Sequence, residues 1–168
     1  MATSLPKAGL RPFLPADVPL LAEIFRASIA GLTEEDYSES QQEAWAATAA
    51  DEAAFGRRLA GVLTLVATVA GAPVGFVALK GRETIDLLYV HPGAVRRGIA
   101  TMLCEAIEQL AKARGAEAVT VDASDTAEPF FRRRGYAAQQ RNTVPLGGEW
   151  LGTTTMRKPL AGATRLDA

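Results

Sequence analysis

A mostly apolar segment, a loop that contains glycine and a strongly amphipathic segment follow one another between residues 84 and 110. Residues 84–90 (TIDLLYV) are mostly apolar and predict a central strand. Beyond Gly98, apolar residues recur every three or four positions as far as Leu110, which predicts a helix with one buried face. Gly115 suits the end of that helix. The chain therefore passes directly from a buried strand into a packed helix.

The other segments extend this alternation of strands and helices. Two short apolar runs, residues 63–69 and 74–79, flank the turn Gly71-Ala72-Pro73 and predict an antiparallel hairpin. Further strands are expected at residues 8–13, 119–121, after Gly135 and at 153–156. One helix is expected from Pro15, and a second along an alanine-rich stretch that contains Trp45, Phe55 and Leu59. A further short helix is expected at residues 124–134. The order predicts an α/β (α+β) protein with a mixed, mostly antiparallel sheet of about seven strands and helices on both faces.

Composition narrows the class of protein. A chain of 168 residues fits one domain, residues 1–168, with 48% hydrophobic and 22% charged residues. The net charge of -1 gives no electrostatic case for nucleic acid or an anionic membrane as partner. A single cysteine, an N-terminus without the apolar core of a signal peptide and no apolar run near ~20 residues favour a cytoplasmic protein.

The loop before the predicted helix has the features of an anion site. Helix N-termini offer unpaired N–H groups and partial positive charge, which bind phosphates. Glycine at position 98 allows close approach of the backbone to a ligand, Ala100 keeps the next turn slim, and Arg96 and Arg97 add two cations. The alternative is an ordinary surface loop before a helix.

Two stretches resemble a known family. The segment LYVHPGAVRRGIATML is similar to the acetyl-CoA-binding motif Q/R-x-x-G-x-G/A of the GCN5-related N-acetyltransferase (GNAT) superfamily, with residues 95–100 in its six positions. The later segment VDASDTAEPFFRRRGY looks like the next motif of that family: a strand, a short helix and a glycine before an aromatic residue. The resemblance implies a GNAT-like fold along nearly the whole chain. It also implies an enzyme that moves an acetyl group from acetyl-CoA to a primary amine in a ternary complex.

The resemblance also assigns the cofactor-binding residues. A bulge would separate the central strand from its neighbour, and the backbone of Leu88, Tyr89 and Val90 would bind the pantetheine arm. Ser124 would lie near the pantetheine. Two aromatic residues, Phe130 and Phe131, would form a wall of the channel, and Arg133 or Arg134 would approach a CoA phosphate. The backbone amides that would hold the pyrophosphate belong to Arg96, Arg97, Gly98, Ile99, Ala100 and Thr101.

The sequence departs from the family pattern at two positions. The first motif position holds Val95 where Gln or Arg is usual, but a backbone N–H is still present there. Phe131 stands where the family often has a tyrosine that protonates the departing thiolate. Another group, or water, would then have to supply that proton. A catalytically weak or inactive acyl-CoA-binding regulatory module is therefore the alternative function.

Two residues are candidates for the chemistry. Acyl transfer to an amine requires a base, and Asp86 is the only acid well inside the central strand. Regular alternation would place it on the face of Thr84, Leu88 and Val90, away from Tyr89. The alternative is a buried acid that accepts hydrogen bonds from an arginine or from backbone donors. Tyr37, in the polar loop after the first helix, is the candidate acid, with an ordinary loop tyrosine as the alternative.

Other features do not suggest additional chemistry. His91 and Cys104 are the only residues of their kinds, so no zinc cluster is expected and no metal is predicted. The chain has no nucleotide-binding P-loop pattern. The expected partner is a small-molecule or peptide amine, and the protein would act as a monomer or a homodimer.

Overall fold

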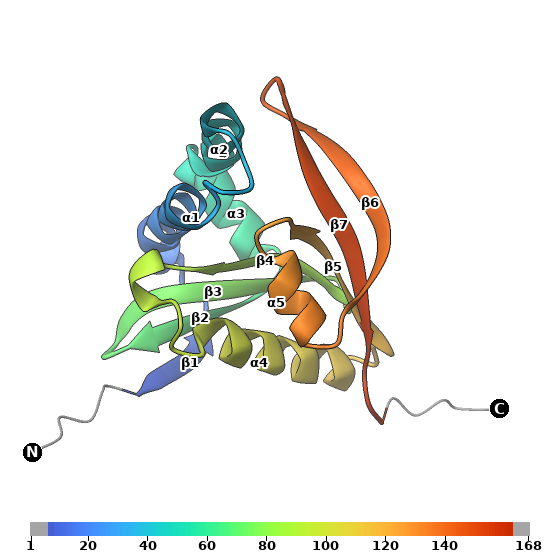
Figure 1. Ribbon diagram of the computed structural model, residues 1–168. Coiled ribbons are helices and arrows are strands. Elements are labelled where there is room, and N and C mark those ends of the chain that lie inside the picture. The colour runs from blue at the N-terminus through green and yellow to red at the C-terminus, as the bar shows by residue number, and fades with distance from the viewer. Residues whose placement is uncertain (1–6, 163–168) are drawn as a thin grey trace, which may run out of the picture.

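A single seven-stranded sheet forms the centre of the protein. The computed structural model describes residues 7–162 (Figure 1), so both ends of the domain predicted over residues 1–168 lie outside the described part. The strand order is β1-β2-β3-β4-β5-β7-β6. The strands are β1 (Ala8–Pro12), β2 (Leu63–Val69), β3 (Ala72–Lys80), β4 (Thr84–Val90), β5 (Ala118–Ser124), β6 (Ala137–Leu146) and β7 (Glu149–Pro159).

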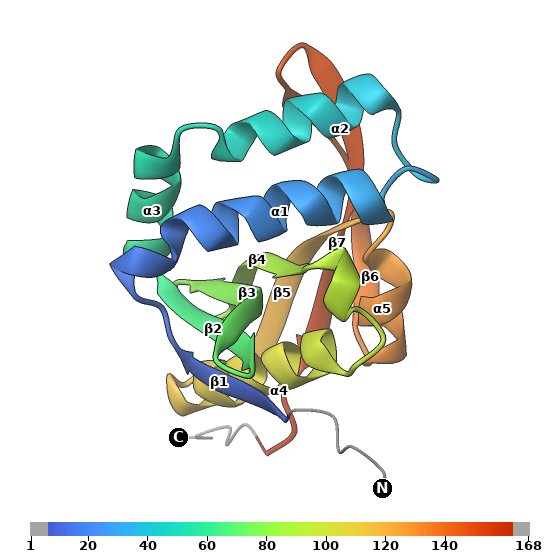
Figure 2. The same ribbon diagram turned by 90° about the vertical axis from the view of Figure 1, so that its left-hand side faces the viewer.

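Helices cover both faces of the sheet, and two buried clusters separate the layers (Figure 2). On one face, α1 (Val18–Leu32) and α3 (Glu52–Ala60) pack through Phe25 and Phe55. On the other face, α4 (Ile99–Ala113) and α5 (Glu128–Arg133) pack through residues that include Leu103 and Phe131. The mixed α/β fold and the mostly antiparallel sheet predicted from the sequence are confirmed, since only β4 and β5 pair in parallel.

The alanine-rich stretch forms two helices where one was expected. Helix α2 (Glu39–Ala46) passes into a short 3₁₀ turn (Ala47–Ala49), and α3 starts afresh. The side chain of Thr48 donates to the Trp45 carbonyl at 2.7 Å, and Asp51 caps α3 by accepting from the Ala54 N–H at 3.0 Å. Both side chains bond to nearby backbone groups, which favours a break over a continuous helix.

Helix α4 lies unusually close to β3 at its first turn. A Cβ atom on Gly75 would be 3.2 Å from Ile99 Cγ2 and 3.0 Å from the Tyr89 carbonyl oxygen. Glycine therefore lets the start of α4 approach β3, next to the end of β4. This contact fixes the position of the loop between them.

The two halves of the sheet meet through a very short parallel pairing. Only Thr84↔Thr120 and Ile85↔Val121 pair β4 with β5. Beyond them, residues 86–90 and 122–124 run without pairing to one another; we call this region the β4–β5 fork. It is the separation of the central strand that the family resemblance implied.

A β-bulge in β4 lies where the fork begins. Ile85 pairs with Leu79 but Leu87 pairs with Ala78, so Asp86 is the extra residue. Ile85 packs on the α4 side and Leu87 on the α1 side, although the two residues are two positions apart. The predicted alternation along this strand was therefore wrong. Asp86 and Tyr89 lie on the face of the sheet that α1 and α3 cover, whereas Leu88 and Val90 lie on the α4 face. Asp86 was predicted on the face of Leu88 and Val90.

Candidate functional site

Backbone groups at the inner edge of β4 are free of sheet partners. Leu88, Tyr89 and Val90 pair with β3 on one side, and within residues 7–162 no strand pairs with them on the other. Since alternate residues of a strand direct their N–H and C=O groups to opposite sides, some of these groups point into the fork. Such groups can bind an extended ligand as a further strand would.

The loop before α4 offers a second set of free donors. Within residues 7–162, no protein group accepts a hydrogen bond from the N–H groups of residues 96–101. Arg96 and Gly98 have positive φ angles of 64° and 74°, and Gly98 is the N-cap of α4. A Cβ on Gly98 would meet nothing within 4 Å. The loop and the helix N-terminus therefore present adjoining amides to an anion.

The side chains of this loop divide between core and solvent. Ile99 is buried and anchors the helix, whereas Val95 and Ala100 are partly buried against the same cluster. Arg96 and Arg97 are exposed, as is Thr101. All six predicted motif positions thus lie in one short segment, beside the end of β4.

The second predicted motif lies across the fork, with one exception. Ser124 ends β5, and its hydroxyl accepts from the Ala127 N–H at 3.1 Å. Phe131 is only 2% exposed and packs edge-on to Phe130, which is partly buried. Arg133 is exposed. Arg134, the other candidate for a CoA phosphate, instead points into the core.

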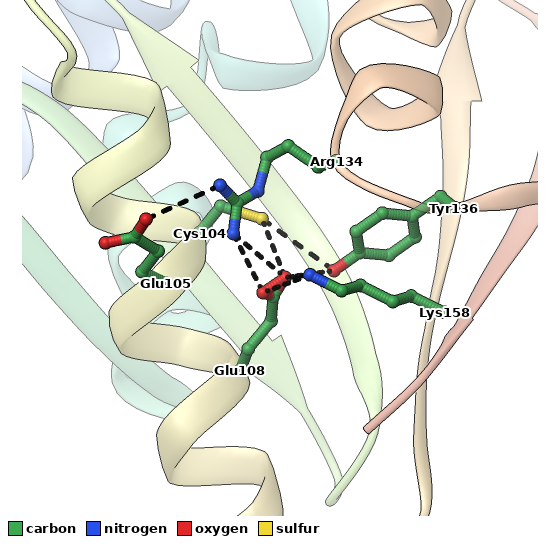
Figure 3. Close-up of polar contacts among 6 residues, drawn as sticks. All are labelled: Cys104, Glu105, Glu108, Arg134, Tyr136 and Lys158. Atoms are coloured by element: carbon green, nitrogen blue, oxygen red, sulfur yellow. Dashed lines mark hydrogen bonds and ion pairs between the residues drawn. The ribbon is translucent and has the colours of Figure 1, made fainter. Parts of the chain in front are cut away.

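Arg134 belongs to a buried polar cluster beneath the fork (Figure 3). The Glu108 carboxylate on α4 accepts from Arg134 at 3.0 Å, from Lys158 at 2.9 Å and from the Tyr136 hydroxyl at 3.3 Å. Cys104 lies one helical turn away, and burial raises the pKa of its thiol. The cluster ties α5 and β7 to α4, so Arg134 has a structural role in this arrangement.

Asp86 forms an ion pair at the base of the fork. Its two carboxylate oxygens accept from Nε and Nη2 of Arg58, both at 3.0 Å. The side chain of Asp86 is 21% exposed and that of Arg58 is 44% exposed. The arginine partner considered as the alternative for Asp86 is therefore present, and the carboxylate still reaches solvent.

Tyr37 is held across the open end of the fork. Its hydroxyl donates to the Gly152 carbonyl at 2.7 Å and accepts from the Asp125 N–H at 2.9 Å. Burial raises the pKa of Tyr37, so the phenol stays protonated at neutral pH. It thereby attaches the loop after α1 to β7 and to the end of β5.

Three aromatic rings connect the two arms of the fork. Trp45 lies edge-on to Tyr37 with centroids 5.5 Å apart, and edge-on to Tyr89 at 6.3 Å. The Trp45 indole N–H donates to the Tyr89 hydroxyl at 3.2 Å. Burial raises the pKa of Tyr89 far above its ordinary value. We call Tyr37, Trp45 and Tyr89 the aromatic bridge.

Asp122 is a second acid at the base of the fork. It follows Val121 as Asp86 follows Ile85, and it lies on the same face of the sheet, opposite α4. Its Oδ1 atom accepts from the Thr155 hydroxyl at 2.5 Å, and that hydroxyl accepts from Asn142 Nδ2 at 2.8 Å. Within residues 7–162, Asp122 has no cationic partner.

Sequence reasoning missed Asp122 and Arg58. It named Tyr37 and Tyr89 but did not predict that Trp45 connects them. Asp122 had a visible signal, because it is the one charged residue in a strand of otherwise alternating apolar character. The contact of Arg58 with Asp86 and that of Tyr37 with Gly152 span 28 and 115 residues, and no local pattern indicates them. The described residues contain no group of three or more His, Cys, Asp or Glu side chains placed to hold a metal, and no helix long and apolar enough to span a membrane.

Comparison with known proteins decides the family. The acetyltransferase (GNAT) domain family matches residues 33–160. The chain belongs to the GNAT acetyltransferase family. It is accordingly an acyl-CoA-dependent N-acetyltransferase by class. An uncharacterized N-acetyltransferase of Escherichia coli strain K12, YafP, is 34% identical over 148 residues, which cover 88% of this chain and 93% of that protein.

Solved GNAT structures share the fold. A GCN5-related N-acetyltransferase from Rhodopseudomonas palustris is 59% identical and superimposes with a TM-score of 0.90, covering 95% of this chain and 99% of that one. The PaiA N-acetyltransferase of Thermoplasma acidophilum, solved with coenzyme A, is 17% identical with a TM-score of 0.77. The match covers 92% of this GNAT chain and 99% of the PaiA chain. The second likeness concerns the fold alone.

Proposed function

We propose that this protein transfers an acetyl group from acetyl-CoA to a primary amine, directly and in a ternary complex. The observation that carries the proposal is the fork, with free strand edges beside the unpaired amides of residues 96–101. These two donor sets suit the amide-containing arm and the pyrophosphate of an acyl-CoA. The structure of PaiA, which has the same fold, contains coenzyme A.

In the proposed reaction, the amine nitrogen forms a bond to the acetyl carbon and the carbon–sulfur bond breaks. The sulfur keeps the electron pair of that bond and takes up one proton. The acceptor enters as an ammonium ion and loses two protons. One proton ends on the CoA sulfur, and the other is released to solvent. Asp86, whose carboxylate is 21% exposed at the base of the fork, is the proposed base, directly or through water.

Tyr37 is the proposed acid. Its raised pKa keeps it protonated, and donation to sulfur requires its hydroxyl to leave the Gly152 carbonyl. Tyr37→Phe tests this role. A fall in kcat of about tenfold or more, with acetyl-CoA binding unchanged, would support it. An unchanged kcat would remove Tyr37 from the mechanism and leave water as the proton source.

The first experiment is a calorimetric titration with acetyl-CoA of the wild type and Asp86→Asn, followed by an assay of CoA thiol release with a panel of amines. We expect similar acetyl-CoA binding by both proteins and a kcat lowered by about 10²-fold or more in the variant. Absence of acetyl-CoA binding would overturn the proposal. Binding without turnover on any amine would favour the regulatory module. The cytoplasmic location suggested by the single cysteine stays a prediction.

A further inference from the structure

The two acids at the base of the fork are not equivalent. Both oxygens of Asp86 already accept from the Arg58 guanidinium. Asp122 accepts only from a neutral hydroxyl, at Oδ1, and its Oδ2 makes no hydrogen bond within residues 7–162. One carboxylate is therefore neutralised by a cation of the protein, and the other is not.

The Asp122 side chain is held in place by a neutral hydroxyl rather than by a cation. Asn142 donates to the Thr155 hydroxyl, which is therefore left to donate its own proton to Asp122. This chain of two hydrogen bonds runs across β6, β7 and β5 on the face opposite α4. On the same face, the side chain of Arg157 is exposed and makes no ion pair among the described residues. Asp122 is thus oriented and exposed, and no cation pairs with it among the described residues.

The aromatic bridge lies on the same side of the sheet as the two acids. Tyr89 on β4 faces α1, on the same side of the sheet as Asp86, which contacts Arg58 on α3. Tyr37 reaches the end of β5 through the Asp125 N–H, so the rings cross from one arm of the fork to the other. The Thr153 hydroxyl, two residues from Thr155, is buried without a partner within residues 7–162. Acid, hydroxyl and aromatic groups therefore lie along the fork on one face of the sheet.

We infer that Asp122 binds the ammonium group of the acceptor, and that the acceptor is a cationic primary amine with an apolar or aromatic group next to the nitrogen. This inference rests on the proposed function and names the substrate class for the same site. A carboxylate with one free oxygen pairs with an ammonium ion, and aromatic rings attract both cations and apolar carbon. Asp86 then receives the proton from an amine that Asp122 has positioned.

Three variants separate this role from a general loss of charge. Asp122→Asn removes the charge and keeps the shape of the side chain. Thr155→Val removes the hydroxyl that orients Asp122. Glu117→Gln is the matched control, because Glu117 is an exposed acid just before the same strand, at the end away from the fork.

The test compares charged and neutral acceptors in the assay of thiol release. Phenethylamine and 1,4-diaminobutane are ammonium ions at neutral pH, whereas aniline is uncharged. We expect Asp122→Asn to raise KM for the two cations by about tenfold or more, with a smaller rise for Thr155→Val. KM for aniline, the affinity for acetyl-CoA and the behaviour of Glu117→Gln should remain near the wild type. Equal loss for aniline and the cations, or no loss at all, would overturn the inference.

Binding provides a readout that does not depend on turnover. The same amines are titrated calorimetrically into wild-type and Asp122→Asn protein saturated with CoA. Binding by the wild type that is lost in the variant supports the inference. Binding of acetyl-CoA without binding of either cation overturns the inference and leaves the proposed donor site standing. Failure to bind acetyl-CoA overturns the proposed function itself, and the inference with it.

Discussion

At the scale of single residues, two buried carboxylates form ion pairs that connect separate elements of the fold. Among residues 7–162, Asp17 and Glu108 are the buried acids, and each is paired with cations. Removal of one partner of a buried pair leaves the other charge poorly solvated, which costs more than the pair itself contributes. Both acids therefore make testable contributions to stability.

Glu108→Gln should lower the free energy of unfolding by about 1–3 kcal/mol, measured by urea denaturation. The change leaves Arg134 and Lys158 without their anion, although their side chains are 15% and 26% exposed and gain some hydration. Glu105→Gln is the control, because Glu105 is 60% exposed and 3.7 Å from Arg134. Equal effects of the two variants would contradict a special role for the buried cluster.

Asp17 links β1 to the start of α1 and predicts a dependence of stability on pH. Arg11 donates to both carboxylate oxygens at 2.7 Å, and this hydrogen bonding is the main reason that the pKa of Asp17 lies below its usual value of 3.8. A lowered pKa means that the unfolded chain binds the proton more readily. The contribution of Asp17 is thus fully present above about pH 4 and is lost as the pH falls through the lowered pKa.

Asp17→Asn should therefore destabilise the protein by about 1–3 kcal/mol at neutral pH, since Asn cannot form the ion pair. The difference from wild type should shrink as the pH falls below the usual pKa of 3.8. Urea denaturation of both proteins over a pH series measures it. A difference that stays constant into acid would show that the charge of Asp17 does not matter.

At the scale of elements, the contact between β3 and α4 sets the geometry of the donor loop. Gly75→Ala would place a methyl group 3.0 Å from a backbone oxygen and close to Ile99. We expect a loss of stability of about 1–3 kcal/mol and weaker binding of acetyl-CoA, because α4 must move. Thermal unfolding and calorimetry measure the two effects.

Gly9→Ala is the matched control for that prediction. Gly9 lies on the edge strand β1, and its methyl group would lie 3.2 Å from the Thr68 side chain of β2. It should alter stability without changing the affinity for acetyl-CoA. Unchanged affinity in Gly75→Ala would show that the loop keeps its position independently of this contact.

Elements with a regular period could be predicted from the sequence, and interrupted ones could not. Helix α4 was visible because its apolar residues recur without a break from Ile99 to Ala111. The bulge at Asp86 reversed the predicted faces of β4, since alternation assumes an unbroken ladder. The break between α2 and α3 depends on the side chains of Thr48 and Asp51, which an alanine-rich pattern conceals.

At the scale of the whole molecule, two half-sheets are joined by two residue pairs and by contacts across the fork. Besides the aromatic bridge, Gln41 on α2 donates to the Trp150 carbonyl at 2.7 Å, and Ala44 lies against Gly147 in the β6–β7 turn (Figure 1). The residues proposed to hold the donor lie in local motifs, which a single sequence displays. The acceptor half depends on contacts between distant segments, which a single sequence does not reveal.

Acetyl-CoA should stabilise the junction between the half-sheets. In the proposed complex it enters the fork and forms hydrogen bonds with the edge of β4 and the loop before α4, so hydrogen–deuterium exchange should slow at the amides of residues 88–90 and 96–101. The buried amides of β2, remote from the fork, serve as an internal reference. Uniform slowing across the protein, or none in these two segments, would contradict the proposed position of the donor.

The proposed use of backbone groups for the donor and side chains for the acceptor has an evolutionary consequence. The groups proposed to hold the donor are peptide amides, which every residue except proline supplies, so most point mutations leave them intact. The groups proposed to select the acceptor are side chains such as Asp122 and Trp45, drawn from separate elements. Duplicated genes with this architecture can therefore change their amine by a few substitutions while they keep the same acetyl donor.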